Sequence, residues 1–275
     1  MHDIAYSTKE VTEEEWKMTN NEISVCLTFD FDADSAQVRQ LEEPGRISKG
    51  LFAVRRGMPR ILSLLNKYNI KATFFVCGWV AEKYPELTKS IIDNQHEIAA
   101  HGYLHEYFDT LSIYEEKTII DNTTKILQEF SEIYGFRAPY FKLSSNTLKL
   151  LAEAGYIYDS SLMADDHPYI LSFPESKNKM VEFPVEWFLD DWVMFESHQN
   201  SPEVVFNIWK SQFDALLEME DIPPDRRIIN YTFHPACSGH AYRLKVLDRL
   251  ISHMKSRSTR FVRMIDSAKE LLTEK

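Results

Sequence analysis

Apolar residues along the chain gather in short runs, and seven of these runs have the length and composition of β-strands. The runs at 23–31 and 72–77 are apolar at nearly every position. Such runs are typical of strands that are buried on both faces of a parallel sheet. The seven predicted strands span residues 23–31, 72–77, 97–101, 135–140, 156–160, 181–186 and 228–234.

Between these runs, apolar residues recur at the spacing of one helical face. The stretch Met58-Pro-Arg-Ile-Leu-Ser-Leu-Leu has this spacing behind an early proline, a usual position for proline in a helix. The alternation of strands and helices predicts an α/β fold with a parallel sheet. The predicted helices span residues 57–68, 85–94, 113–133, 145–154, 202–219, 241–255 and 265–272.

The alternation runs on without a linker, a low-complexity tract or an internal repeat. We therefore expect a single catalytic domain over residues 21–275, preceded by an N-terminal extension over residues 1–20. The charged stretch 33–51 is expected to be a long loop after the first strand. In βα barrels, the loops that follow strands build the active-site face.

Charge and cysteine content narrow the choice of partners and of compartment. The chain has 31 Lys and Arg against 42 Asp and Glu, a net charge of −11, which argues against nucleic acid or an anionic membrane as the main partner. The apolar stretch 72–81 is shorter than the roughly 20 residues of a membrane-spanning helix. Cys26, Cys77 and Cys237 lack CxxC spacing and read as reduced thiols, so a cytoplasmic location is expected.

Two aspartates and two histidines carry the candidate chemistry. Asp30 and Asp32 close the first predicted strand and share one face, since side chains on a strand alternate. His101 and His105 lie in Ala-Ala-His-Gly-Tyr-Leu-His-Glu at the end of another strand. Two imidazoles and one carboxylate form the ligand set of a catalytic zinc site, which leaves a position open for water. The second carboxylate is then free to act as a base, and the pattern indicates metal-assisted hydrolysis.

Three further motifs lie at the ends of predicted strands. Arg137 could pair with a carboxylate and lower its pKa, His234 could donate a proton, and Asp190 or Asp191 could hold that histidine. Taken alone, each also fits a structural explanation, such as a turn before proline or an acidic loop. Their shared position favours one site, because the carboxyl ends of parallel strands converge on one face of a barrel.

These motifs, taken in order, resemble those of the polysaccharide deacetylase family (NodB homology, carbohydrate esterase 4). The resemblance spans about residues 24 to 267. It implies a distorted seven-stranded (β/α) barrel, in agreement with the strands predicted from the apolar pattern. The five matching blocks are Thr28-Phe-Asp-Phe-Asp, His101-Gly-Tyr-Leu-His, Arg137-Ala-Pro-Tyr, the acidic block from Trp187 to Trp192, and Thr232-Phe-His-Pro.

The resemblance also implies a role for each matching residue. Zn²⁺ or another divalent metal would be the cofactor, and Asp30 matches the general base. The remaining matches are Asp32, His101 and His105 to the metal ligands, Arg137 to the arginine that orients the base, the Tyr140 backbone N–H to the oxyanion donor, His234 to the general acid, and Asp190 or Asp191 to its partner.

Other stretches resemble an intracellular branch of the family, which includes peptidoglycan-deacetylase-like proteins, metal-independent allantoinases and cyclic imidases. The first block reads Thr-Phe-Asp-Phe-Asp where the family usually has Thr-Phe-Asp-Asp-Gly, and Gly102 replaces a hydroxyl residue. Both changes belong to this branch, which by analogy also suggests a homo-oligomer. The stretches are Ile47-Ser-Lys-Gly-Leu-Phe, Ala100-His-Gly-Tyr and Glu182-Phe-Pro-Val-Glu-Trp-Phe-Leu-Asp-Asp.

We therefore expect a metal-dependent hydrolase of C–N amide bonds that deacetylates an N-acetylated sugar or a related amide. Two alternatives stay open: a ring-opening amidohydrolase of cyclic imides or ureides, and a catalytically silent barrel that binds a ligand. Tyr140, Tyr103 and Trp192 are expected to contact a small-molecule or oligosaccharide substrate. Trp187 and Trp209 are expected in the core, where aromatic side chains of barrels usually lie.

Overall fold

The computed structural model describes residues 5–7, 22–173, 178–219, 221–222 and 226–273. The expected N-terminal extension, residues 1–20, lies outside the described residues except for the short strand β1 (Ala5–Ser7), which pairs with β7 (Tyr169–Ser172). The domain boundary expected at residue 21 therefore stays a prediction.

A parallel sheet forms the centre of the molecule, and all seven predicted strands are present in it. Neighbouring strands pair in parallel from β2 through β3, β4, β5 and β6 to β8, and β9 pairs with the other edge of β2. Most strands are shorter than predicted. Their bounds are β2 (Ile23–Phe31), β3 (Thr73–Val76), β4 (Glu97–Ala100), β5 (Gly135–Phe136), β6 (Tyr158–Asp159), β8 (Lys179–Glu182) and β9 (Ile228–Phe233).

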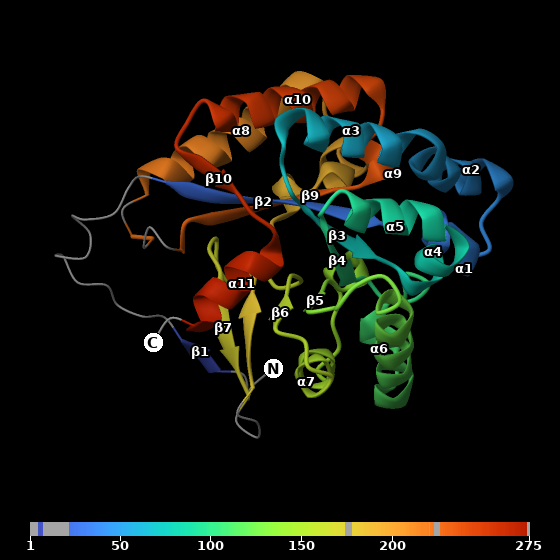
Figure 1. The fold of residues 1–275 in the computed structure, drawn as a ribbon. Helices are drawn as coiled ribbons and strands as arrows, with labels where there is room; N and C mark the ends of the chain where they lie inside the picture. Colours follow the sequence, from blue (N-terminus) through green and yellow to red (C-terminus); the bar gives the residue numbers. More distant parts are fainter. Residues whose placement is uncertain (1–4, 8–21, 174–177, 220, 223–225, 274–275) are drawn as a thin grey trace.

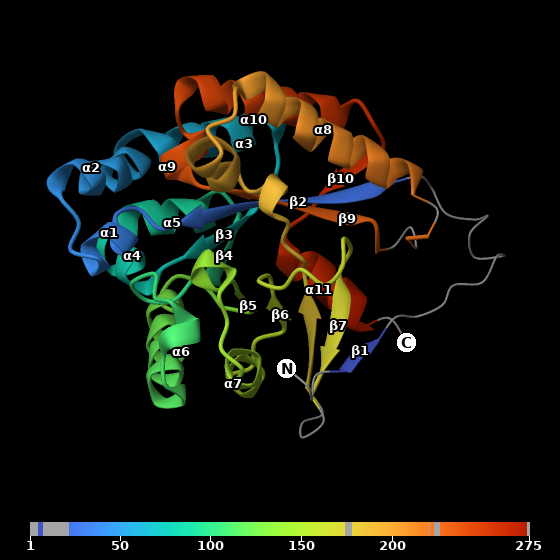
Figure 2. The ribbon, with the colours of Figure 1, turned by 180° about the vertical axis from the view of Figure 1, so that it is seen from behind.

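A single contact brings the two ends of this strand series together. Asp190, in the segment after β8, forms an isolated parallel bridge with Thr232 of β9. The curved sheet is therefore a distorted barrel, with its strands seen from opposite sides in Figures 1 and 2. The predicted barrel of α/β type is confirmed. Three of the described strands were absent from the prediction: β1, antiparallel β7 and parallel β10 (Thr259–Phe261).

Helices cover the outside of the sheet, at the places where the helical spacing predicted them. Figures 1 and 2 show α3, α8 and α10 together over β2 and β9. No helix in the described ranges is both long and apolar enough to cross a membrane. The predicted helices have the bounds α3 (Met58–Tyr68), α5 (Pro85–Asp93), α6 (Ile113–Leu127), α7 (Thr147–Glu153), α8 (Pro202–Glu218), α10 (Ala241–Lys255) and α11 (Met264–Thr273).

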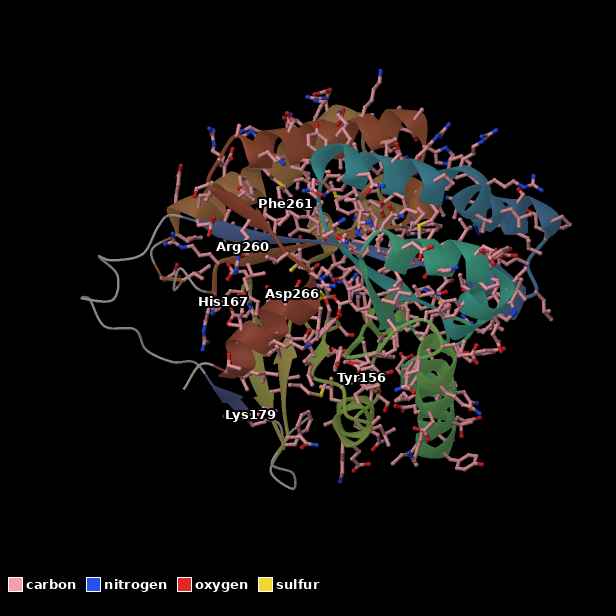
Figure 3. The ribbon with its side chains drawn as sticks, in the orientation of Figure 1. Tyr156, His167, Lys179, Arg260, Phe261 and Asp266 are labelled. Atoms are coloured by element: carbon pink, nitrogen blue, oxygen red, sulfur yellow. The ribbon has the colours of Figure 1, made fainter. Side chains whose placement is uncertain are left out.

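Helix α11 closes the end of the barrel where the parallel strands begin. Its Met264 and Ala268 are fully buried in one cluster with Cys26, Phe75 and Val181, which come from three different strands. Two ion-pair contacts also link it to the edge of the sheet, where Arg260 of β10 (labelled in Figure 3) meets Glu270 of α11 at 3.2 and 2.9 Å. At the opposite end, where the strands finish, the surface is formed by the segments that follow the strands.

The prediction of a long loop at 33–51 was wrong. This segment forms α1 (Ser35–Arg39) and α2 (Pro44–Phe52), and α2 continues through a π-helical turn, η2 (Ala53–Gly57), into α3. A glycine inside a charged stretch suggested a loop, but Gly50 is there for close packing. A Cβ at this position would lie 2.4 Å from the Ala33 carbonyl oxygen, so α2 packs directly on the backbone that leaves β2.

A second helix, α4 (Gly78–Lys83), follows β3 where the prediction had only an apolar run. Val80 and Ala81 of this helix are fully buried. An apolar run that passes from a buried strand into a buried helix has no change in polarity to mark the boundary.

Candidate active site

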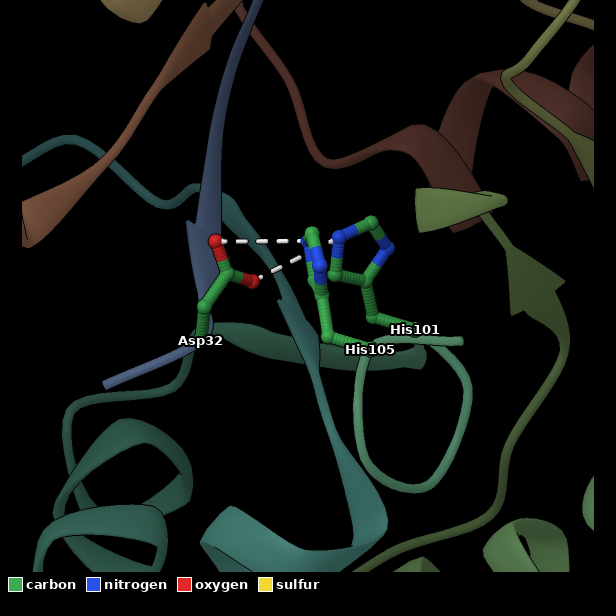
Figure 4. A group of neighbouring side chains, drawn as sticks. All are labelled: Asp32, His101 and His105. Atoms are coloured by element: carbon green, nitrogen blue, oxygen red, sulfur yellow. Dashed lines mark ion pairs between the residues drawn. The ribbon is translucent and has the colours of Figure 1, made fainter. Parts of the chain in front are cut away.

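A carboxylate and two imidazoles meet at the carboxyl ends of β2 and β4. The Nε2 atom of His101 lies 3.4 Å from Oδ1 of Asp32, and Nε2 of His105 lies 3.6 Å from Oδ2 of the same residue (Figure 4). The three potential ligand atoms all lie within 4.8 Å of one another. His105 has a positive φ of 58°, which turns the loop after β4 back toward β2.

The chemistry of these donors fits a divalent cation. His101 donates a hydrogen bond from Nδ1 to the Arg137 carbonyl oxygen at 2.7 Å, so in the neutral ring Nε2 has its lone pair free to bind a metal. Burial, with His101 and His234 nearby, holds the pKa of His105 well below its usual range, which keeps that ring neutral. A carboxylate and two neutral imidazoles are the donors that Zn²⁺ prefers in a catalytic site.

Asp32 shows the cost of placing a carboxylate here without a cation. Burial raises the pKa of Asp32, and the negative charges of Asp30 and Asp191 add to the rise although His101 and His234 oppose it. A bound cation would remove this cost, because it stabilises the ionised carboxylate.

Asp30, the second carboxylate, is buried and held by a fully buried arginine. Arg137 donates from Nη1 to Asp30 Oδ1 at 2.7 Å, and its remaining bonds to Thr28 and Ser160 fix the plane of the guanidinium. Burial alone would raise the pKa of Asp30. Arg137, followed by His101 and His234, outweighs that effect and lowers the pKa, so Asp30 is ionised at neutral pH.

His234, directly after β9, lies close to the carboxylates of both Asp30 and Asp32. Its Nε2 lies 3.8 Å from Asp30 Oδ2 and 3.9 Å from Asp32 Oδ2. Its Nδ1 lies 2.7 Å from Asp191 Oδ1, while the same nitrogen is 3.9 Å from Asp190. Of the two aspartates that the sequence left open, Asp191 is therefore the one that contacts His234.

Asp190 and Asp191 are adjacent in the sequence but accept hydrogen bonds from different groups. Asp190 Oδ1 accepts hydrogen bonds from the backbone N–H groups of Trp192 and Val193, at 2.7 and 3.2 Å, and so starts the next turn. Asp191 is fully buried and also accepts from the backbone and hydroxyl of Ser238.

The two aspartates together make His234 a strong base. Burial opposes protonation of His234, but the charges of Asp190 and Asp191 outweigh it and raise the pKa of the ring well above its usual range. Burial, opposed by His234 but helped by Asp191 and Asp30, also raises the pKa of Asp190 to about 7. His234 is thus protonated at neutral pH.

A cavity of about 360 Å³ is lined by Asp30, Asp32, His101, His105, Asp190 and His234. Of the expected substrate contacts, Tyr140 and Trp192 line it. The Tyr140 ring packs edge-on against His105 with ring centroids 4.4 Å apart, and its backbone has a positive φ of 58°. The centroids of the Trp192 and His234 rings lie 5.7 Å apart. The Lys49 ammonium lies over the Trp192 ring, 4.4 Å from its centroid.

Tyr103 is not among the residues that line the cavity, and its expected role as a substrate contact stays a prediction. Its hydroxyl donates to Glu82 of α4 at 2.9 Å, and its ring lies against Gly78. The sequence placed it between His101 and His105, but the turn that brings both histidines to Asp32 directs the side chain between them away.

Sequence reasoning did not place Gln37, Lys49, Phe141 and Trp187 at the site, although all of them line the cavity. Gln37 and Lys49 come from α1 and α2, and the available signal was that this segment follows the first strand, where βα barrels build the active-site face. Phe141 directly follows the Arg137-Ala-Pro-Tyr motif and Trp187 is the first residue of the acidic block, and these positions were the available signal. Trp187 was expected in the core but is 46% exposed, whereas Trp209 is fully buried there as expected.

Comparisons with known sequences indicate one protein family. The family model described as "Polysaccharide deacetylase" matches residues 17–158, just over half of the 275 residues. A peptidoglycan deacetylase of Helicobacter pylori is 29% identical over 287 aligned residues, which cover 91% of this chain and 97% of that protein. A peptidoglycan deacetylase-like protein of Gibberella zeae is 26% identical and is matched over 92% of this chain and 87% of its own length.

Solved structures show the same fold. A candidate polysaccharide deacetylase from Mycobacterium smegmatis is 31% identical, with a TM-score of 0.81 and coverage of 94% of this chain and 92% of that one. The Puue allantoinase structure has a TM-score of 0.82 over 94% of this chain and 93% of its own, but at 20% identity it shows the fold alone. On the family match and the 31% identical relative, the chain belongs to the polysaccharide deacetylase family.

Proposed function

We propose that the chain is a divalent-metal-dependent hydrolase that removes acetyl groups from N-acetylated sugars. The observation that carries this proposal is the meeting of three functions in one cavity: the ligand group Asp32–His101–His105, the ionised Asp30 and the protonated His234. The names of the relatives support the sugar substrate, since those from Helicobacter pylori and Gibberella zeae are called peptidoglycan deacetylase and peptidoglycan deacetylase-like.

The cofactor would be held by Asp32, His101 and His105. When bound there, Zn²⁺ or another divalent cation supplies Lewis-acid chemistry, polarising the amide carbonyl and lowering the pKa of water. Asp30 accepts the proton of the attacking water, and Arg137 keeps its carboxylate aimed into the cavity. The backbone N–H of Tyr140 donates to the developing oxyanion, a contribution of about 3 kcal/mol for one such donor.

His234 completes the reaction as the general acid. It follows β9, the strand paired with β2, with Nε2 3.8 Å from Asp30 Oδ2 and Nδ1 2.7 Å from Asp191 Oδ1. Asp191 holds the ring in one orientation and stabilises its protonated form. The ring therefore donates its Nε2 proton to the leaving nitrogen of the amide.

A compact substrate is the second candidate, and the shape of the cavity favours it. The helices α1 and α2 wall the site on one side through Gln37, Lys49 and Gly50. The cavity volume of about 360 Å³ is near the lower end of the range for ligand sites, about 300 to 1,000 Å³. A cyclic imide or ureide, opened by the same groups, would fit such a closed space.

The compartment is also a proposal. Cys26, Cys77 and Cys237 are all free and buried. Unpaired thiols are usual in reducing compartments, so we propose a cytoplasmic enzyme.

The decisive experiment combines metal analysis with two substitutions. Protein purified without chelators should contain about one divalent metal ion per chain. Asp30→Asn should keep the metal and lose about 10³-fold in turnover of acetylated chito-oligosaccharide, because the base is gone. His101→Ala should lose both metal and turnover.

Two matched variants serve as controls. Asp121→Asn removes an exposed carboxylate on α6, and His198→Ala removes an exposed histidine outside the cavity. Both should behave as the unchanged protein. Succinimide and allantoin are assayed in parallel, and hydrolysis of these alone would move the assignment to the second candidate. Full turnover by Asp30→Asn on the accepted substrate would disprove the mechanism.

A further inference from the structure

An exposed tryptophan stands at the mouth of the cavity. Trp187, in the short 3₁₀ turn η5 (Trp187–Leu189), lines the cavity while 46% of its surface stays exposed. The ring of Phe141, which also lines the cavity, meets the indole nearly edge-on, with centroids 5.4 Å apart at 65°. Large apolar side chains exposed next to a site usually mark a place where something binds.

The backbone around Trp187 is held firmly. The Glu186 carboxylate accepts a hydrogen bond from the Phe188 N–H at 2.7 Å. The indole N–H of the buried Trp209 donates to the Phe188 carbonyl oxygen at 2.8 Å, which ties the turn to α8. The backbone that carries the indole is therefore held in place before any ligand arrives, which reduces the conformational entropy that is lost when a ligand packs on it.

The next residue offers an internal comparison. Phe188 is exposed to a similar extent, 48%, but it does not line the cavity. Its ring is parallel to that of His198, with centroids 6.0 Å apart. Two neighbouring aromatic residues are thus equally exposed, and only Trp187 borders the catalytic groups.

The size of the cavity indicates which part of a substrate would contact Trp187. A volume of about 360 Å³ suits a small ligand, so the rest of a longer substrate must leave through the mouth. The C–H groups on one face of a sugar ring pack well against the electron-rich face of an indole. A cyclic imide or ureide, by contrast, ends inside the cavity.

We propose that Trp187, flanked by Phe141, is the platform for a second sugar ring, next to the ring whose acetamide enters the cavity. The inference rests on the proposed deacetylase function and adds to it that the substrate is an oligosaccharide, bound across at least two rings. Trp187 is a specificity-determining residue under this proposal, and it takes no part in the chemical step.

The test compares Trp187→Ala with its neighbour Phe188→Ala on two substrates, N-acetylglucosamine and its β-1,4-linked tetramer. Trp187→Ala should raise KM for the tetramer about tenfold, the loss of one aromatic stacking contact, with kcat within about twofold. Its kcat/KM for the monomer should fall by a smaller factor than its kcat/KM for the tetramer, because the monomer has no second ring to stack on the indole. Trp187→Phe should restore part of the loss, and Phe188→Ala should match the unchanged protein on both substrates. An unchanged KM for the tetramer in Trp187→Ala would overturn the platform.

A binding measurement separates this proposal from the function on which it rests. Calorimetry measures tetramer binding to the Asp30→Asn protein, with and without Trp187→Ala. If the unchanged enzyme hydrolyses neither sugar, the deacetylase proposal fails, and weaker tetramer binding in the double variant would still support the platform. Equal binding by the two proteins, or binding by neither, would reject it.

Discussion

Single buried residues set the ionisation of the site. Arg137 reaches Asp30 from β5 across the barrel and lowers its pKa against the effect of burial, while Asp191 and Asp190 do the reverse for His234 by raising its pKa. A base that is ionised and an acid that is protonated at the same pH are what hydrolysis of an amide requires. Both states depend on partners that the cavity does not expose: Arg137 and Asp191 are fully buried.

The contact between Asp191 and His234 gives a prediction at this scale. Asp191→Asn should lower kcat by about 10² to 10⁴, because a neutral amide neither stabilises the protonated ring nor enforces its orientation. Asp190→Asn should cost less, since Asp190 contributes its charge to the protonated ring but hydrogen-bonds backbone N–H groups and does not orient the ring. Steady-state kinetics on the accepted substrate measures both. A larger loss in Asp190→Asn than in Asp191→Asn would reverse the assignment of the partner.

At the scale of elements, backbone contacts without side chains hold the segment that carries His234. The π-helical turn η2 lies against α9 (Pro235–Ser238), which starts directly after His234. A Cβ on Gly57 would lie 2.1 Å from the Pro235 carbonyl oxygen, and one on Gly239 would lie 2.4 Å from the Gly57 Cα. The helix that walls the cavity and the loop that carries the acid therefore move together or not at all.

Gly57→Ala tests this contact. The variant should lower the free energy of unfolding by about 1 to 3 kcal/mol, the usual cost of inserting an atom where backbones touch. It should also lower kcat, since α9 must shift away from η2. Gly45→Ala in α2 is the control: its Cβ would meet only the flexible Glu43 carboxylate at 3.3 Å, and the change should be neutral or slightly stabilising. Urea denaturation compares the two, and equal stabilities would contradict the close packing.

At the scale of the whole molecule, the two ends of the barrel have separate tasks. The site lies at the carboxyl ends of the strands, and α11 fills the other end, where a buried acid fastens it. Glu97, at the start of β4, accepts hydrogen bonds from Thr73 at 2.6 Å, Tyr158 at 2.6 Å and the Ile265 N–H of α11 at 3.1 Å. Burial is the largest influence on Glu97 and raises its pKa to about 6, although these bonds oppose it.

A pH dependence of stability follows from Glu97. Its folded-state pKa lies above the ordinary value, so its contribution is fully present below about pH 4.5 and is lost as the pH rises through about 6. The loss amounts to about 2 kcal/mol. Glu97→Gln removes the ionisation, so the unfolding free energy of the unchanged protein minus that of the variant should fall by this amount between pH 4.5 and 7. A difference that stays constant with pH would contradict the assignment.

The apolar pattern along the chain was sufficient to predict the strands and helices that have a regular run of apolar residues. The buried strands β2, β3, β4 and β9 were predicted within a residue or two, because a continuous apolar run records burial on both faces. The same reasoning placed Asp30, His101 and His234 at strand ends, and parallel strands bring those ends to one face. Elements without a period of their own, such as β7, β10 and α1, gave no such signal.

Sequence alone therefore determined where the seven main strands lie along the chain, the family and the residue types expected at one end of the barrel, since these follow from spacing and short motifs. Tertiary structure decided the rest: that Asp191 and not Asp190 meets His234, that Tyr103 turns toward α4, and that α2 walls the cavity. The physical reason is distance along the chain. A side chain's partner depends on how segments tens or hundreds of residues apart pack together, and no local period records that packing.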